Sequence, residues 1–476
     1  MGGAGGTGVG NEALRALLEE AQISNAGLAR AVISAAAREG THLGTNATSV
    51  RRMLSGAQPR HPVPRLIATV LSRRLERQVR VTDCGFIDQE PTGEDPYDGL
   101  TCSGTLEGTL RTVVELSERD MRRRKLLLGS AFSVPAFAEP MVIALLVPPA
   151  QVRARAAGQR VGMADVQVLT EQVDHLIRLG FQFGSGRVRE QAVALLNRQA
   201  NQLLHGSYSE KIGTALLSGV AQVTRLAGFM AGDTGRDALA QRYYIQALDL
   251  AMRAGDRRYA AFGLATMSRM TVRIGENLPT EQDTVRHGRQ AVALARAGLT
   301  ITQGTATPAL AAELHALEAR GLALLGETYA ARQAALSAER RYELVRPGDE
   351  PPWRLFYSES SLTADVAVCL RGIGETQQAI TLGTTALQAV APWKVRGRCI
   401  DQLDLALTHL RGRDWEQAVA YGRDALRSAT DVTSTMITQR LRTLHRHLQP
   451  LRANSPHLRE LDERLTTYFT HSARHH

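Results

Sequence analysis

The feature that most constrains the fold is a loosely repeated pair of helices in the C-terminal part of the chain. Residues 366–390 and 405–429 align with one residue of slippage, and each combines a helix, a glycine-containing turn and a second helix. Alanines recur at matching places in five segments: Ala240 and Ala247, Ala291, Ala331 and Ala338, Ala379 and Ala386, and Ala418 and Ala425. Small residues at a fixed place let paired helices approach closely. The pattern predicts tetratricopeptide-like helical repeats over residues 161–470, stacked into an α-solenoid with a concave face.

The repeat is longer and looser than the 34-residue tetratricopeptide unit. The second alanines recur after 44, 47, 48 and 39 residues between Ala247 and Ala425, which indicates divergent units or longer helices and loops. Aromatic residues make up only 5% of the chain, whereas Ala, Leu and Arg are abundant. Unbranched side chains lose little rotamer freedom in a helix, so the expected fold class is all-α.

The first 80 residues predict a separate domain of four short helices. After a flexible tail at residues 1–10, apolar residues at helical spacing predict helices over about 11–22, 25–39, 45–55 and 62–77. Residues 1–80 carry 11 basic and 5 acidic side chains, and the whole chain has a net charge of +10. A GC-rich genome explains why only three of the cations are lysines, but the excess of positive charge suits an anionic partner.

The third of these helices buries little and presents polar side chains. With Val50 as the inward reference, Ala47, Met53 and Leu54 fall on the same side at 100° per residue. Arginine can bind guanine or a phosphate, and Ser and Thr can bind phosphates or base edges. A solvated helix face is the alternative interpretation. The residues predicted to contact DNA, on or just after this helix, are Thr45, Thr48, Ser49, Arg51, Arg52, Ser55, Arg60, His61 and Arg65.

Two connecting regions separate the domain from the repeats. Residues 81–110 contain seven acidic residues and no Lys or Arg, which is typical of a solvated acidic linker. Residues 111–160 predict a connector helix followed by an apolar segment, 126–149, that Pro135, Glu139 and Pro140 interrupt. We expect this segment to pack against the repeats. The alternatives are a membrane span and, because of the RRRKLLLG start, a twin-arginine export signal.

The sequence offers no constellation for catalysis. It contains no HExxH, GxSxG or GxxxxGK[ST] motif, and its four cysteines are far apart with no CxxC spacing. The glycines of the first ten residues match GxGxxG but have no strand before them. We therefore expect no enzymatic activity, no cofactor and no metal site. The absence of a secretory signal pattern and the scattered cysteines favour a reduced, cytoplasmic and nucleoid-associated protein.

The N-terminal motifs SNAGLAR (24–30), TSVRRMLSG (48–56) and PVPRLIATVLSRRL (62–75) resemble a family of Streptomyces-type regulators. Its members, the NsdA-type regulators, combine a divergent XRE-like helix-turn-helix domain with C-terminal tetratricopeptide-like repeats. The RRRKLLLG element also resembles this family. The resemblance implies a helix-turn-helix over residues 11–80 and a repressor of development or secondary metabolism. The connector at 39–45 is longer than the usual turn of a helix-turn-helix.

The repeats suggest the remaining partners. We expect a homodimer through the repeats, because one basic domain alone binds double-stranded DNA weakly at physiological salt. A peptide or small-molecule effector is expected in the groove, where Asn197 and Asn201 are candidate ligand residues, with two solvated amides as the alternative. Trp353, Phe356 and Tyr357 form a second candidate cluster or part of the core. The rival function is a protein-interaction scaffold that does not read DNA.

Overall fold

The computed structural model describes residues 11–38, 45–59, 63–75, 77, 79–86, 99–121, 132–147, 152–346, 348–354 and 356–472. The chain divides into two compact units, residues 1–96 and 97–476. Within the described ranges both units consist of helices and connecting turns, and the nearest approach to a sheet is a pair of isolated bridges, Arg155 to Tyr208 and Arg160 to Ser207. The predicted all-α fold class is confirmed.

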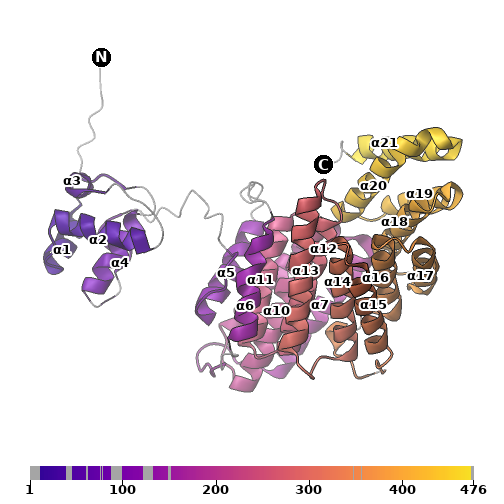
Figure 1. Ribbon diagram of the computed structural model, residues 1–476. Coiled ribbons are helices and arrows are strands. Elements are labelled where there is room, and N and C mark those ends of the chain that lie inside the picture. The colour runs from indigo at the N-terminus through magenta and orange to yellow at the C-terminus, as the bar shows by residue number, and fades with distance from the viewer. Residues whose placement is uncertain are drawn as a thin grey trace, which may run out of the picture. The chain divides into compact units, whose positions relative to one another are not determined.

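The described residues of the N-terminal unit form four α-helices and one short 3-10 turn around a small apolar core (Figure 1). Leu14, Leu28, Val50 and Leu66, one from each helix in turn, are fully buried in this core. Ser24 accepts a hydrogen bond from the Gly27 amide and so caps the second helix. The elements are α1 (Glu12–Glu20), α2 (Asn25–Arg38), α3 (Ala47–Leu54), α4 (Val63–Arg74) and η1 (Thr82–Cys84).

The core of this unit extends beyond residue 80, into the range that the sequence analysis assigned to the acidic linker. Cys84 and Phe86 are buried in it. Asn11 holds this end in place, because its side chain accepts from the Leu14 amide and donates to the Cys84 carbonyl, both at 2.9 Å. Gly85 lies in the left-handed region with φ +68°, and a Cβ there would meet the Asn11 side chain. A glycine is therefore required at this turn.

The C-terminal unit is built on successive helix pairs, and in all but the last of them the two helices pack mainly on each other (Figure 1). This arrangement is the solenoid-like stack that the repeated pattern predicts. The pairs are α10 (Glu210–Asp233) with α11 (Asp237–Arg253), α12 (Arg257–Gly275) with α13 (Glu281–Ile301), α14 (Pro308–Leu324) with α15 (Thr328–Tyr342), α16 (Glu359–Gly372) with α17 (Thr376–Ala389), α18 (Val395–Arg411) with α19 (Trp415–Ala429), and α20 (Thr435–Leu448) with α21 (Pro456–Ser472).

The repeated alanines explain how the pairs pack. All of them lie on the second helix of a pair, and each is at most 2% exposed. Ala331 and Ala338, for example, are fully buried on α15. An alanine has no side chain beyond Cβ, so two helices can approach closely along these positions. The longer repeat has two sources, the length of helices such as α12 and α13, with 19 and 21 residues, and the connection 343–358 between α15 and α16.

Glycines in the turns between paired helices adopt a conformation that other residues avoid. Gly326, between α14 and α15, has φ +73° and no heavy atom within 4 Å of an added Cβ. A Gly326→Ala substitution therefore tests the backbone alone. We expect it to lower the free energy of unfolding by about 1 kcal/mol, measured by urea denaturation. Gly104→Ala is the matched control, since Gly104 also has open space at Cβ and lacks a positive φ; an equal loss in both variants would contradict the argument.

Several further elements precede the pairs. They are α5 (Leu106–Met121), η3 (Val134–Phe137), α6 (Ala138–Leu146), α7 (Met163–Phe183), η4 (Ser185–Arg187), α8 (Arg189–Ala194), the π-helical segment η5 (Leu195–Ala200) and α9 (Asn201–Leu204). Two further short elements, η6 (Pro352–Arg354) and η7 (Gln449–Asn454), lie further along the chain.

In the described part of the apolar segment, Phe137 is fully buried against the repeats. The Gln241 side chain forms hydrogen bonds with both the amide and the carbonyl of the Ser133 backbone. No helix in the described ranges is both long and apolar enough to cross a membrane.

The first and last helix pairs of the array are tied together through α7 and the turn after it. Asp233, fully buried at the end of α10, accepts from the Ser185 amide, the Arg396 guanidinium and the Ser434 hydroxyl. The backbone of Thr433 also bonds Phe183 and Gly186. These contacts join α7 and η4 to α18 and α20, and α7 packs on α10 and α18, the first helices of two pairs.

Candidate functional site

The third helix of the N-terminal unit has the two faces that the sequence predicts. Asn46 and Ser49 form a capping box at its start, with the Asn46 side chain accepting from the Ser49 amide at 2.9 Å. Gly56, with φ +95°, ends it. Val50 and Met53 are buried, whereas Thr48, Arg51 and Arg52 are exposed. The helix is therefore held by its cap and a few apolar contacts, and its outward face is polar.

The two arginines of this face are unpaired in the part of the chain that the structure describes. Neither Arg51 nor Arg52 forms an ion pair or a side-chain hydrogen bond there, while Arg15 pairs with Glu12 and Arg77 pairs with Glu20 elsewhere in the same unit. An exposed guanidinium without a carboxylate partner keeps all its donors for an anion. The outward face of α3 is thus chemically suited to phosphate or to guanine.

Three predicted contact residues on or beside α3 lie in surroundings that the helical wheel does not predict. Thr45 is only 8% exposed, so the prediction that it points outward is wrong. It precedes the capping residue, and the direction of the incoming chain rather than helical periodicity sets its orientation. Ser49 is half-buried and its hydroxyl belongs to the capping box. Ser55 is exposed, and its hydroxyl donates to the Arg51 carbonyl at 3.1 Å.

The remaining predicted contacts cannot be placed in the same way. Arg60 and His61 lie outside the described residues. Arg65 lies in the first turn of α4, and the described residues do not include its side chain.

The two asparagines proposed as ligand residues lie apart from the concave face. The Asn197 side chain, in the π-helical segment, donates to the Ser117 hydroxyl of α5 at 3.0 Å. The carbonyl of Asn201 accepts a hydrogen bond from the His205 ring. Neither residue lines the cavity described next. Asn197 therefore helps to dock α5.

A cavity of about 310 Å³ opens on the side of the C-terminal unit that the first helices of the pairs form, which is the side called the concave face here. The first helices of five successive pairs, from α12 to α20, line it together with α7 and α10. The aromatic cluster found in the sequence is part of its wall, because Trp353, Phe356 and Tyr357 all line it. The second of the two sequence candidates for a ligand site is thus the one that lies at a cavity, and 310 Å³ suits a small organic ligand.

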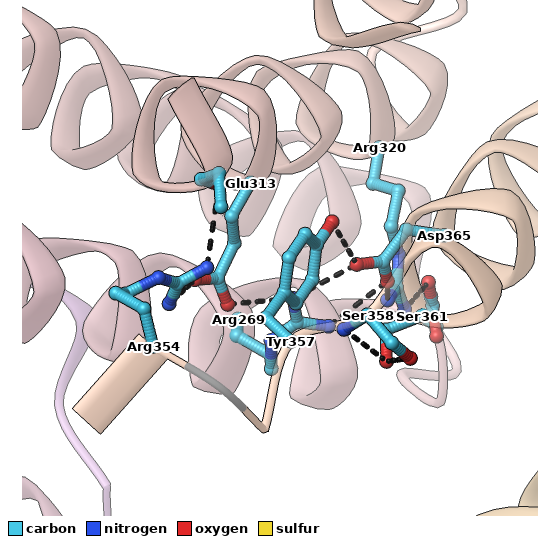
Figure 2. Close-up of polar contacts among 10 residues, drawn as sticks. Arg269, Glu313, Arg320, Arg354, Tyr357, Ser358, Ser361 and Asp365 are labelled. Atoms are coloured by element: carbon cyan, nitrogen blue, oxygen red, sulfur yellow. Dashed lines mark hydrogen bonds and ion pairs between the residues drawn. The ribbon is translucent and has the colours of Figure 1, made fainter. Parts of the chain in front are cut away.

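A chain of ion pairs, here called the ion layer, crosses the first helices at this cavity (Figure 2). Arg269 of α12 binds both oxygens of Asp365 of α16, at 2.9 and 2.8 Å, and Arg320 of α14 binds the same carboxylate at 2.7 Å. The Tyr357 hydroxyl donates to it at 3.2 Å. Burial alone would raise the pKa of Asp365, but the two guanidinium groups outweigh burial and lower this pKa to about 2.

The ion layer continues on both sides of Asp365. Glu313 receives Arg269 and Arg354, each through a different oxygen, at 2.9 and 2.6 Å. Arg320 also binds Glu276 at 2.6 Å. In the next pairs, Asp404 of α18 accepts from Arg371 and from Arg440 of α20. Eight members belong to the first helices or their ends, namely Arg269, Glu276, Glu313, Arg320, Asp365, Arg371, Asp404 and Arg440, and Arg354 comes from η6.

Sequence reasoning missed the ion layer because its members are tens of residues apart and share no local motif. The available signal was a charged residue among apolar neighbours at helical spacing, such as Asp365 between Leu362 and Cys369. That pattern indicates a buried charge but does not identify the residue that pairs with it. The register of the stacked helices supplies the partner.

Comparison with known families concerns the N-terminal unit. Residues 14–87 match the SP15 N-terminal domain family. The matched region runs from α1 to the residue after Phe86, so it includes the buried turn that extends the core. It covers less than a fifth of the 476 residues. A comparison with curated proteins found no match.

One carboxyl group at the cavity of the C-terminal unit, that of Asp401, has a pKa near neutral pH. Burial and, to a lesser extent, the nearby charge of Asp404 raise the pKa of Asp401 to about 7, against the opposing effect of Arg440. The unfolded chain releases this proton near pH 4. The folded protein therefore holds a proton that the unfolded chain has lost, and stability falls as pH rises from about 4 to about 7.

An Asp401→Asn substitution is expected to remove this dependence. The variant and the wild type should unfold at similar temperatures near pH 4, and the variant should be the more stable one at pH 8, because it carries no charge that burial disfavours. Thermal unfolding across this pH range measures the difference. Asp431→Asn, at an exposed carboxylate, is the control. A constant difference between Asp401→Asn and wild type at every pH would contradict the assignment.

Proposed function

We propose that the chain is a sequence-specific DNA-binding transcriptional regulator. The observation that carries the proposal is the outward face of α3, where exposed Arg51 and Arg52 have no described partner while Val50 and Met53 anchor the helix. In helix-turn-helix proteins a short helix of this kind enters the major groove. Arginine then reads guanine or holds a phosphate. The resemblance to Streptomyces-type regulators supports a repressor of development or secondary metabolism.

The C-terminal unit would serve the regulator in two ways. As a homodimer it would present two α3 helices to half-sites about 34–36 Å apart along the duplex. Its cavity on the concave face would hold a peptide or small-molecule effector. The cavity supports this second role because it is lined by helices from several pairs, so a ligand there can favour one arrangement of the array over another.

Genome-wide mapping of DNA fragments bound by the full-length protein, followed by a salt titration on one recovered fragment, tests the proposal. A regulator should enrich a common sequence, and the logarithm of its binding constant should fall linearly with the logarithm of salt concentration. Sedimentation with and without the fragment gives the oligomeric state. Recovery of no enriched sequence would favour the scaffold, in which the N-terminal unit binds a protein.

A further inference from the structure

We propose that the cavity on the concave face binds a small organic anion with an aromatic body, and that Arg225 and Lys394 supply its counter-charge. The inference rests on the effector-binding part of the proposed function. It does not depend on DNA binding by α3.

The charge balance at the cavity is the first argument. Eight cationic and four acidic side chains line it. Six of the cations form ion pairs with carboxylates of the described chain, among them Arg273 with Asp237 and Arg396 with Asp233. Arg225 and Lys394 are the two that have no carboxylate partner among the described residues. Both are only 8% exposed. A buried cation without a counter-ion is costly, so an anion entering the cavity would gain from both.

The geometry of Arg225 leaves its terminal nitrogens available. Its Nε donates to the Tyr259 hydroxyl at 2.9 Å, and its guanidinium lies 4.5 Å from the centre of the Phe262 ring. The hydrogen bond at Nε and the contact of one guanidinium face with the Phe262 ring together fix the orientation of the guanidinium plane. The two terminal nitrogens have no hydrogen bond within the described chain and are not enclosed by it. They present the planar pair of donors that fits a carboxylate or sulfonate.

Lys394 shows the same arrangement on another aromatic pair. Its ammonium group donates to the Phe356 carbonyl at 3.2 Å and lies 5.7 Å from the centre of the Phe181 ring. Only neutral groups hold it, and burial lowers the pKa of Lys394, with the charge of Asp401 opposing that shift. Lys394, at the start of α18, therefore places its ammonium group beside an aromatic surface, and no carboxylate of the described chain pairs with it.

The aromatic walls identify the rest of the ligand. Phe262 stacks on Trp353 with ring centres 5.2 Å apart, and Phe181 stacks on Phe356 at 5.9 Å. Each stack therefore contains the ring that one of the two cations faces. A bare inorganic anion would leave these walls and most of the 310 Å³ unused. A planar apolar group attached to the anion would cover them, which favours an aromatic acid.

Fluorescence titration of the full-length protein with 1-anilinonaphthalene-8-sulfonate tests the proposal, because this probe joins an aromatic body to an anion. N-phenyl-1-naphthylamine is the matched neutral probe, since it has the same rings and no sulfonate. We expect one sulfonate bound per chain and at least tenfold weaker binding of the neutral probe. Equal affinity for the two probes would overturn the proposal, and this comparison requires no variant to fold.

Two variants assign the counter-charge. Arg225→Met and Lys394→Met remove the charge and keep an unbranched apolar stem, and each should weaken binding of the sulfonate about tenfold without changing binding of the neutral probe. Arg296→Met removes one charge at an exposed position of α13, where Arg296 pairs with Glu318, and should bind as the wild type does. Unchanged affinity for the sulfonate in both cavity variants would overturn the assignment.

Competition experiments distinguish two kinds of ligand that would both carry an anionic group and an aromatic ring. Displacement of the sulfonate by 2-naphthoate supports a free aromatic acid as the ligand. Displacement only by a short peptide ending in phenylalanine supports a peptide C-terminus. If the C-terminal amide of that peptide also displaces the sulfonate, this would contradict an anionic ligand. No DNA is present in these titrations. Loss of DNA binding would therefore leave the cavity proposal intact, and a cavity that binds neither probe would leave DNA binding by α3 intact.

Discussion

Replacing Arg51 and Arg52 together by alanine is expected to weaken binding to a recovered genomic fragment by about thirtyfold or more. Each arginine that binds guanine or a phosphate contributes roughly 1–3 kcal/mol, and every 1.4 kcal/mol is about a factor of ten in affinity. Both side chains are exposed and unpaired among the described residues, so their removal breaks no internal contact. Fluorescence anisotropy at fixed salt measures the loss, and circular dichroism checks that the helices remain.

Arg15 and Arg77 provide a control of equal charge within the same unit. Both are paired with carboxylates, Arg15 with Glu12 and Arg77 with Glu20. A double Arg15→Ala, Arg77→Ala variant removes the same two charges from outside α3. If binding depends on the net charge of the unit alone, this control will lose as much affinity as the α3 variant, and the assignment of α3 as the reading helix will fail.

The single variants separate base reading from phosphate binding. Loss of a phosphate contact weakens all sequences about equally and lowers the slope of the salt dependence by about one. Loss of a bidentate contact to guanine relaxes the preference at one position of the site. Arg51 and Arg52 are adjacent on the helix and so point about 100° apart. We therefore expect them to differ in this comparison, with at most one of them setting base preference.

The two faces of α3 and the paired helices were predictable because both follow from short-range periodicity. Val50 and Met53 are buried, and the alanines of the second helices are buried, as their spacing predicts. Thr45 was placed wrongly because it lies outside the helix, where 100° per residue no longer applies. Capping geometry, not amphipathicity, decides such positions.

Contacts between distant segments could not be predicted in the same way. The acidic and glycine-rich composition after residue 80 is typical of a linker, yet Asn11 and Gly85 dock Cys84 and Phe86 on the first core. The carboxylates of the ion layer likewise resemble solvated charges when they are considered one helix at a time. Their partners come from neighbouring helix pairs, and only the register of the stack brings them together.

Asp365→Asn is expected to lower the free energy of unfolding by about 3–5 kcal/mol, the usual loss when one partner of a buried ion pair is removed. Asparagine keeps the shape of the side chain but cannot balance Arg269 and Arg320, which both bind this carboxylate. Glu460→Gln is the matched control, because Glu460 also pairs with two arginines, Arg423 and Arg464, at a partly exposed site. Solvent screens that site, so its loss should be much smaller. Chemical denaturation of both variants gives the comparison.

The pH dependence of the same variant identifies the cause. The pKa of Asp365 is about 2 in the folded protein and near 3.8 when it is unperturbed. A carboxyl group whose pKa is lowered by folding stabilises the protein above the unfolded value, and this contribution is lost as pH falls from about 4 to about 2. The difference in stability between wild type and Asp365→Asn should therefore be full at pH 6 and shrink through this window. A difference that stays constant down to pH 2 would show that Asp365 acts through packing rather than charge, and the ion layer would then not be what joins the helix pairs at the cavity.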